Sequence, residues 1–347
     1  MHIGLTDEQD MLRDTVARLA EAMATTSADA VAHGDALDSQ WQRVVELGLP
    51  ALRAPESCGL DASGVETAVA LEELARRLAA VPVLGQATLA TELLWAANAE
   101  KEVELIAEGG LRIAPVLADD LSDFADSTDG GVAFDAAGAT HVVLATRDGD
   151  ARRLFTAPVD VGSTTDHAGL DLTRSLHRLA DLDPTPTGEP IGAERWAQVQ
   201  AMALTAVAAD LLGVMAGALD DAVRYAGERV QFGVKIGSFQ AIQHLLADSL
   251  VRLEGARSCV WHAGWAVDHL PADQALLSAR TAKAYASAAC RDVVEAVMQV
   301  LGGISITWEH TAHLRLRRTL LGRRLFGDET TQYGAIAAMR LADRELG

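Results

Sequence analysis

The chain has 347 residues, of which 49% are hydrophobic and 22% are charged. That length is enough for two or three domains, and the composition is typical of a globular protein. Its formal net charge of −20 leaves no general basic surface of the kind that binds a phosphate backbone, so a nucleic-acid partner is excluded.

The cysteines and the N-terminus indicate a soluble, cytoplasmic protein. Cys58, Cys259 and Cys290 are too widely spaced for a disulfide framework or a metal motif, so we expect reduced thiols and no metal site. The first residues, MHIGLTDEQDML, contain a helix cap rather than the charged and apolar regions of a signal peptide. Charges interrupt every apolar run before it reaches membrane-spanning length, so we expect no membrane partner.

Residues 1–110 are predicted to form an N-terminal helical domain. Thr6 can cap a helix together with Gln9 three residues later, and Ser63 with Glu66 repeats this capping box. The stretch LATELLWAANAEKEVELIAEGG, residues 89–110, is predicted to be one helix that ends at its two glycines.

Residues 111–190 are predicted to form a small, reduced β domain. The runs LRIAPVLAD, THVVLAT and RRLFTAP are short and β-prone, and Asp148 and Gly149 between the last two indicate a hairpin turn. Strand signals continue to about Leu182. The stretch DPTPTGEP, residues 183–190, is predicted to be a stiff linker.

Residues 191–347 are predicted to form a C-terminal helical bundle. From Ala193 the apolar pattern keeps helical phase for about 35 residues, which indicates a helix that is apolar on more than one side. Further helices are predicted at residues 238–268, 272–301, 312–325 and 330–346. The predicted fold class is therefore mostly α, with a small β domain between two helical domains.

Two motifs in the bundle region carry chemistry. The segment RVQFGVKIGSF begins with an Arg-x-x-Phe-Gly turn at Arg229, and QVLGGISITWEH begins with Gln-x-x-Gly-Gly at Gln299. A guanidinium offers fixed donors to phosphate oxygens, an aromatic face covers an adenine, and glycines let backbone amides approach a ligand. Either motif alone could be a surface charge or a helix stop. Together they favour an anionic, partly aromatic ligand.

In this order and at this spacing the two segments resemble the signature segments of the acyl-CoA dehydrogenase flavoenzymes. The resemblance covers the whole chain and implies that family's fold, with a middle β-barrel-like domain and a C-terminal four-helix bundle. It also implies FAD as the cofactor and α,β-dehydrogenation of an acyl-CoA thioester as the reaction. In the family these motifs contact the nucleotide end of an FAD that is seated in the neighbouring subunit. The implied FAD-binding positions here are Arg229, Phe232, Gly233, Gln299, Gly302, Gly303, Thr330 and Gln332.

The catalytic base of the family is the first departure from the pattern. The stretch FGDETTQYG places Asp328 where the family's usual glutamate stands, and Glu329 where a glycine is expected. The alternative position for that glutamate in the family, on the long helix, falls on Ala203. Asp210 lies seven residues further, roughly 10 Å along the helix axis, and cannot substitute without rearrangement. Asp328 is therefore a candidate base with a shortened side chain, or alternatively the N-cap of the following helix.

The flavin seat is the second departure. In the family a glycine-rich loop that ends in Ser-Asp follows the first strand of the middle domain, and a tryptophan-containing strand lies beside the ring. Here the matching stretch is PVLADDLSDFAD, and no tryptophan occurs between Trp95 and Trp196.

These departures resemble the smaller, base-lacking subunit of actinobacterial heterotetrameric α2β2 acyl-CoA dehydrogenases of the steroid type. That resemblance implies a homologous partner subunit which seats the flavin and supplies the glutamate, and an acyl-CoA substrate such as a steroid side-chain thioester. Two other functions remain open: a self-sufficient homo-oligomeric dehydrogenase that uses Asp328 or Glu329, and a non-catalytic scaffold or binding protein of the same fold.

Three minor features were assigned structural roles. Trp261, His262 and Trp265 are predicted to fill the bundle core, and His310 with His313 lacks a third ligand for a metal. The run LRLRRTLLGRR, residues 314–324, is predicted to lie on a solvated or partner-facing helix.

Overall fold

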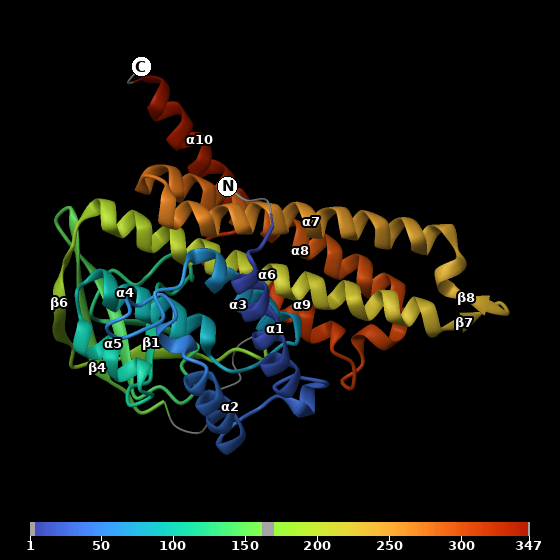
Figure 1. Cartoon of the computed structure of the whole chain (residues 1–347), viewed down its shortest axis with the longest axis horizontal. Coiled ribbons are helices and arrows are strands. Elements are labelled where there is room, and N and C mark those ends of the chain that lie inside the picture. Colours follow the sequence, from blue (N-terminus) through green and yellow to red (C-terminus); the bar gives the residue numbers. More distant parts are fainter. Residues whose placement is uncertain (1–3, 162–169, 346–347) are drawn as a thin grey trace.

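The computed structural model describes residues 4–161 and 170–345, so the predicted helix end at residue 346 lies outside the described residues. The chain forms helices, then one mixed sheet, then a bundle of long helices (Figure 1). The predicted fold class is therefore confirmed, whereas the domain boundaries at residues 110 and 190 stay predictions.

The N-terminal part is helical, and both capping boxes are confirmed. The Thr6 hydroxyl accepts from the Gln9 amide, and the Ser63 hydroxyl accepts from the Glu66 amide. The elements are α1 Asp7–Ala22, η1 Ala28–Ala30, α2 Asp35–Glu46, η2 Leu49–Ala51, α3 Gly64–Arg76, the π-helix η3 Val83–Leu89, α4 Ala90–Ala96 and α5 Glu100–Ala107.

The single helix predicted for residues 89–110 is wrong, because the chain breaks between α4 and α5. Asn98 adopts a left-handed backbone with φ of 54°. The Ala97 carbonyl accepts a hydrogen bond from the Glu189 amide, and the Asn98 side chain donates to the Glu189 carboxylate over 2.8 Å. The strand that contains Glu189 thus occupies the Ala97 carbonyl, which a continuous helix would have needed for its own hydrogen bonds.

The middle part is a six-stranded sheet of order β5-β2-β1-β3-β4-β6, in which β1 and β3 are parallel and the other pairs antiparallel. The predicted hairpin at Asp148 and Gly149 is confirmed by the β3–β4 pairing. The strands are β1 Ile113–Leu117, β2 Gly130–Phe134, β3 His141–Asp148, β4 Ala151–Pro158, β5 Leu176–Ala180 and β6 Thr185–Ile191.

The stiff linker predicted for residues 183–190 is wrong as well. Most of this stretch is β6, which pairs with β4 at the edge of the sheet. Proline is tolerated there because one side of an edge strand needs no amide donors. The prolines of this strand therefore led to the prediction of a linker.

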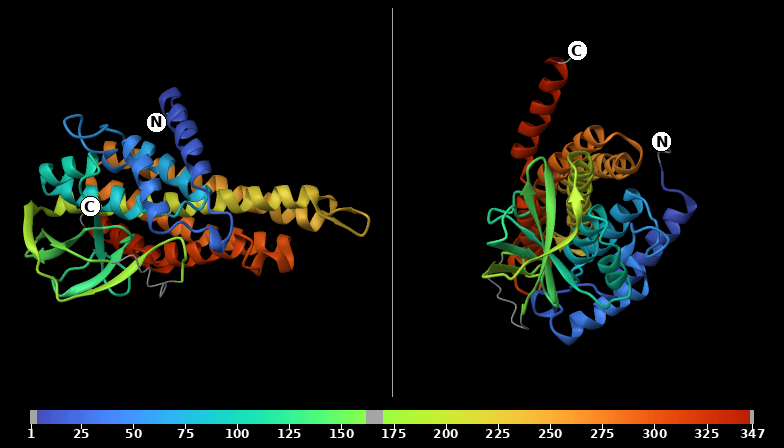
Figure 2. Two further views of the ribbon diagram at one scale, coloured as in Figure 1. Left: turned by 90° about the horizontal axis from the view of Figure 1, so that it is seen from below. Right: turned by 90° about the vertical axis from the view of Figure 1, so that its left-hand side faces the viewer.

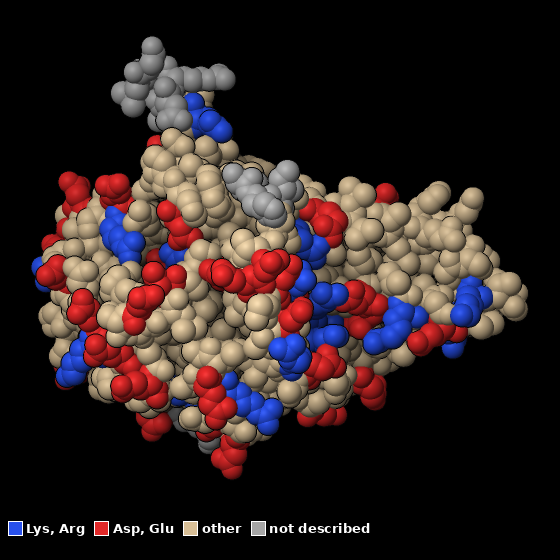
Figure 3. All heavy atoms as spheres, viewed as in Figure 1, with Lys and Arg blue, Asp and Glu red and all other residues tan. Residues whose placement is uncertain are grey.

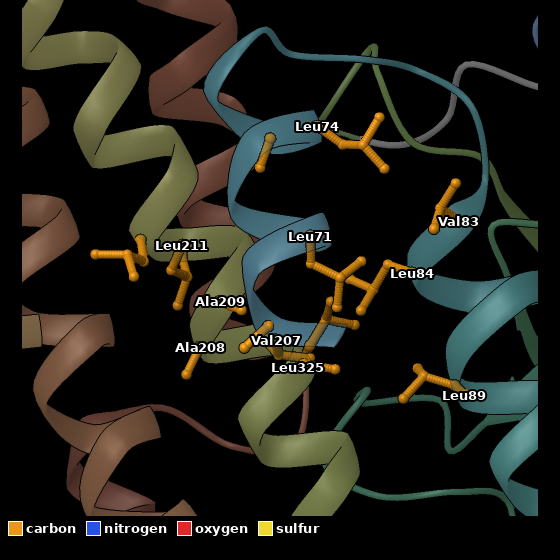
Figure 4. Packing of buried hydrophobic residues seen from close by; sticks show 14 of the residues in the cluster. Leu71, Leu74, Val83, Leu84, Leu89, Val207, Ala208, Ala209, Leu211 and Leu325 are labelled. Atoms are coloured by element: carbon orange, nitrogen blue, oxygen red, sulfur yellow. The ribbon is translucent and has the colours of Figure 1, made fainter. Parts of the chain in front are cut away.

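The C-terminal part is built around α6 Ala193–Glu228, which packs against α3, α7 and α8. Its middle is buried on all sides. An 18-residue window has a mean hydropathy of 1.8, long and apolar enough to cross a membrane, yet the whole window is buried inside the protein. Figure 4 shows Val207 of α6 on the side that faces Leu71 of α3 and Leu84 of η3, whereas Leu211 lies on the opposite side of the same helix. This is the environment of a core helix.

Two features project from this body. The ends of α6 and α7 Gln240–His269 extend as an arm that is closed by the small hairpin of β7 Val230–Gln231 and β8 Val234–Lys235 (Figure 1). The last helix, α10 Glu329–Glu345, leaves the body in another direction, as the right-hand view in Figure 2 shows. The remaining elements are η4 Ile236–Ser238, α8 Ala272–Leu301, η5 Gly302–Ile306 and α9 Ala312–Arg324.

Candidate functional site

The tip of the arm presents the Arg-x-x-Phe-Gly motif to solvent. β7 pairs with β8 in a register that leaves Phe232 and Gly233 as a two-residue turn, with φ of 54° and 79°. Two positive φ values define the turn type that best joins twisted strands, and this turn aims the Phe232 ring outward. Its side chain is 94% exposed. Arg229 is also exposed and forms no ion pair with residues that the structure describes.

The Gln-x-x-Gly-Gly motif lies where α8 ends, at the end of the molecule from which the arm projects (Figure 1). Gln299, Gly302 and Gly303 are all exposed, and Gly302 has a φ of 66°. A Cβ atom added to Gly233, Gly302 or Gly303 would meet nothing within 4 Å. The backbone at both motifs is therefore open to a ligand that approaches from outside the chain.

The surroundings of the two motifs are apolar rather than acidic. Near the arm tip Val230, Val234 and Phe239 are exposed, and Ile306 after the second motif is 74% exposed. Figure 3 shows that the upper part of the arm is largely free of charged side chains, whereas its lower part carries both acidic and basic ones. Large exposed apolar groups in such number are typical of a surface that another protein covers.

Asp328 acts as the N-cap of α10. Its Oδ1 accepts hydrogen bonds from the Thr331 amide at 3.0 Å and the Thr331 hydroxyl at 3.1 Å. The amide hydrogen bond from Thr331 is the main cause that lowers the pKa of the Asp328 carboxyl below its usual value. The cap interpretation is therefore confirmed. A base role would have to compete with both hydrogen bonds, and the neighbouring Glu329 is paired with Arg323.

The other two implied positions on α10 differ from each other. Thr330 is exposed, whereas Gln332 is 1% exposed and forms hydrogen bonds with other residues of this chain. The Gln332 amide nitrogen donates to the Phe326 carbonyl, and its oxygen accepts from Arg280 over 2.9 Å.

The two alternative carboxylate positions on α6 offer no base. Ala203 is 1% exposed within the apolar core. Asp210 is 3% exposed and accepts from Arg318 and Arg174, with the Arg318 Nε at 3.0 Å. Burial alone would raise the pKa of Asp210, but the charges of Arg318 and Arg174 outweigh it and keep that pKa below its usual value. Asp210 is a buried counter-ion.

The prediction of a solvated or partner-facing arginine helix is wrong for two members of the run. Arg318 is 2% exposed and, besides Asp210, donates to the Ala79 carbonyl at 3.0 Å. Arg315 is 5% exposed and is paired with Asp221 over 3.0 Å. The helix carrying them, α9, packs against α6 and α8, and these two arginines reach backbone carbonyls at and after the end of α3. The sequence contains no local sign of that placement.

The aromatic row of α7 is only partly core. Trp261 packs at the edge of the core, while Trp265 stacks between His262 and His269 with ring centroids 5.9 and 4.9 Å apart. Among the described residues, no three metal-ligating side chains lie close enough together to hold a metal ion. His310 and His313 therefore belong to no such group.

The loop after β1, where the resemblance implies a flavin seat, is closed. Phe124 pairs back on Leu117, and the Phe326 amide donates to the Leu121 carbonyl over 2.8 Å. The Phe124 ring is 4% exposed and makes edge contacts with Phe326 at 5.0 Å and Trp196 at 5.5 Å. Aromatic side chains fill the space between this loop and the turn before α10. The wider clefts of about 390 and 660 Å³ lie elsewhere, beside residues 31–38 and between α6 and α7.

Comparison with known proteins identifies the family. Residues 6–104 match the model of the acyl-CoA dehydrogenase N-terminal domain, and residues 200–341 match that of the C-terminal domain. The chain is 31% identical to acyl-CoA dehydrogenase IpdE2 of Mycolicibacterium smegmatis, covering 96% of this chain and 99% of that protein. It is 32% identical to acyl-CoA dehydrogenase FadE34 of Mycobacterium tuberculosis, covering 90% of this chain but only 45% of FadE34.

Solved structures show the same fold. The butyryl-CoA dehydrogenase of Megasphaera elsdenii gives a TM-score of 0.82 at 21% identity, covering 98% of this chain and 100% of that chain. A chain of the ChsE4–ChsE5 complex from Mycobacterium tuberculosis gives 0.78 at 22% identity, covering 97% and 98%. These matches define an enzyme class, the flavin-dependent oxidoreductases that act on CH–CH bonds. The chain belongs to the acyl-CoA dehydrogenase family.

Members of this family bind FAD, and the described residues fit one end of it. Arg229, Phe232 and the open glycines offer a cation, an aromatic face and accessible amides at the surface, which suits a nucleotide held mainly by another chain. The isoalloxazine end does not fit, because Phe124 and its aromatic neighbours fill the space after β1.

Proposed function

We propose that this chain is a subunit of an FAD-dependent acyl-CoA dehydrogenase that catalyses α,β-dehydrogenation of an acyl-CoA thioester together with a homologous partner subunit. One contrast supports the proposal. The nucleotide-binding motifs are exposed and unengaged at the arm and at the end of α8, while the loop after β1 is closed around Phe124.

The residues of this chain bind and position rather than react. The flavin supplies the hydride acceptor when it is bound. The Arg229 guanidinium would donate to the phosphates of the nucleotide, and the Phe232 ring would cover its adenine. Gly302 and Gly303 let backbone amides approach the same nucleotide. No carboxylate among Asp328, Glu329 and Asp210 is free to remove a proton, so the base belongs to the partner.

The partner is a second acyl-CoA dehydrogenase chain in a cytoplasmic α2β2 assembly. ChsE4–ChsE5 is described as a complex of two chains, and the Tcur3481–Tcur3483 steroid enzyme matches with a TM-score of 0.82. The exposed apolar residues of the arm provide the surface for such a partner. The name of the Tcur enzyme favours a bulky steroid-type acyl thioester as substrate.

A self-sufficient enzyme that uses Asp328 is the second candidate, and the family membership is the observation in its favour. The cap hydrogen bonds of Asp328 and the closed loop after β1 weigh against it. A non-catalytic scaffold is the third, and the unengaged nucleotide motifs weigh against it because a scaffold has no need of them.

The test compares the chain expressed alone with the chain co-expressed with its homologous partner. We expect a colourless, inactive protein alone and a yellow, active complex together. Arg229→Met should lower the FAD content of that complex, whereas Arg178→Met, a control at a surface ion pair on β5, should not. A flavin-loaded and active homo-oligomer of this chain would overturn the proposal.

A further inference from the structure

Lys283 of α8 is a lysine with no exposed surface. Its ammonium nitrogen lies 2.9 Å from the Ser287 hydroxyl, 3.1 Å from the Arg323 carbonyl and 2.8 Å from the Gly327 carbonyl. A buried lysine is costly unless its N–H groups have partners, and here three acceptors surround its nitrogen.

The Arg323 carbonyl belongs to the last turn of α9, and the Gly327 carbonyl to the turn that joins α9 to α10. The last carbonyls of a helix have no amide partner within the helix, and when buried they need donors from elsewhere. Like the turn at the arm tip, this turn carries two successive residues with positive φ, Phe326 at 56° and Gly327 at 83°. A left-handed phenylalanine is strained, so the surroundings must hold it in place. Lys283 and Gln332 supply the donors that do so.

The direction of α10 depends on this turn. Gln332 in the first turn of α10 is buried, but further along the helix Tyr333 is 54% and Leu341 is 60% exposed. The main contact of α10 within the chain is α8, the helix that carries Lys283. A helix with so little packing keeps its orientation only through its anchored end.

We propose that Lys283 is a positioning residue that fixes the α9–α10 turn and thereby sets where Thr330 and the exposed face of α10 are presented to the cofactor and the partner subunit. The part of this inference that concerns the cofactor and the partner subunit rests on the proposed function. The anchoring of the turn is a property of this chain alone, and so it can be tested separately.

The experiment measures hydrogen exchange of residues 325–341 in the full chain co-purified with its partner, together with retention of FAD by that complex. Lys283→Met should speed exchange of this segment by about tenfold, the effect of losing one to two net hydrogen bonds, and should weaken FAD retention. Lys283→Arg keeps a charged donor and should rescue both readouts. Lys101→Met, at an exposed lysine of α5, is the matched control.

Two results would overturn the inference: an exchange increase spread evenly over α6, α7 and α8, or faster exchange of the segment with unchanged FAD retention. Should Lys283→Met fail to fold, Ser287→Ala removes one of the three contacts, and an increase of about threefold confined to the same segment is expected. A wild-type complex that holds no FAD would instead refute the proposed function, independently of Lys283.

Discussion

Asp210→Asn gives the sharpest test of the buried charge network at the centre of the molecule. Asp210 accepts from Arg318 and Arg174, and Arg174 also donates to Asp135 over 2.9 Å. Asp210 belongs to α6 and Arg318 to α9, while Asp135 directly follows β2 and Arg174 lies in the loop before β5. Arg318 also reaches the Ala79 carbonyl of the N-terminal part. Asparagine has nearly the same shape as aspartate but removes the charge that balances two buried guanidinium groups.

The expected loss is about 3–5 kcal/mol of unfolding free energy, the usual cost of removing one member of a buried ion pair. With an m-value of about 3 kcal/mol/M, the urea midpoint should fall by roughly 1–1.7 M. The assay is urea unfolding followed by circular dichroism, on the chain in the form in which it purifies.

Asp119→Asn is the matched control. Asp119 and Arg178 form an ion pair of 2.7 Å at the surface, with both side chains more than 60% exposed. Such a pair is worth about 0–1 kcal/mol, so the midpoint should barely move. Equal shifts for the two variants would refute the argument that burial, and not the ion-pair distance, decides the cost.

Three further predictions concern Lys283, Asp328 and Phe124. First, burial lowers the pKa of Lys283 to about 7, against smaller opposing effects of Glu329 and Asp328. The unfolded lysine keeps its proton up to about pH 10.5, so unfolding takes up a proton between these values, and stability should rise with pH from about 7. Lys283→Met should flatten that rise in urea midpoints measured from pH 6.5 to 9.5, and an unchanged slope would contradict the assignment. Second, Asp328→Asn preserves a capping oxygen and should leave activity of the complex within about twofold, while Asp328→Ala should cost α10 about 1 kcal/mol, seen as faster hydrogen exchange. A complete loss of flavin reduction in the asparagine variant would identify Asp328 as a base. Third, Phe124→Ala should lower stability by about 3–5 kcal/mol without giving the isolated chain any FAD, since other aromatic rings still close the loop. Stoichiometric FAD in that variant would show that Phe124 alone blocks a usable seat.

Local patterns predicted much of the fold. The capping boxes at Thr6 and Ser63, the hairpin at Asp148 and the helices 193–228 and 272–301 depend on neighbours in sequence, and those neighbours are visible. Edge strand β6 and the break at Asn98 depend on each other across about 90 residues, which no local pattern contains.

The site was predictable in the same uneven way. The motif spacing indicated Arg229 and Phe232 through its resemblance to the family's signature segments, and Asp328 followed by ETTQ indicated a cap. The burial of Arg318 could not be predicted, because its counter-ion Asp210 lies 108 positions away on another helix. Closure of the seat could be suspected from the missing tryptophan, but the contact of Phe124 with Phe326 required the structure.

Photolabelling with two FAD analogues tests the central claim most directly. One carries its azide on the isoalloxazine ring, the other on the adenine, and each is bound to the co-purified complex, irradiated and mapped by mass spectrometry. The account predicts that the adenine label lands on residues 229–239 or 299–306 of this chain, and that the ring label lands on the partner. A ring label on residues 118–126 of this chain would contradict it.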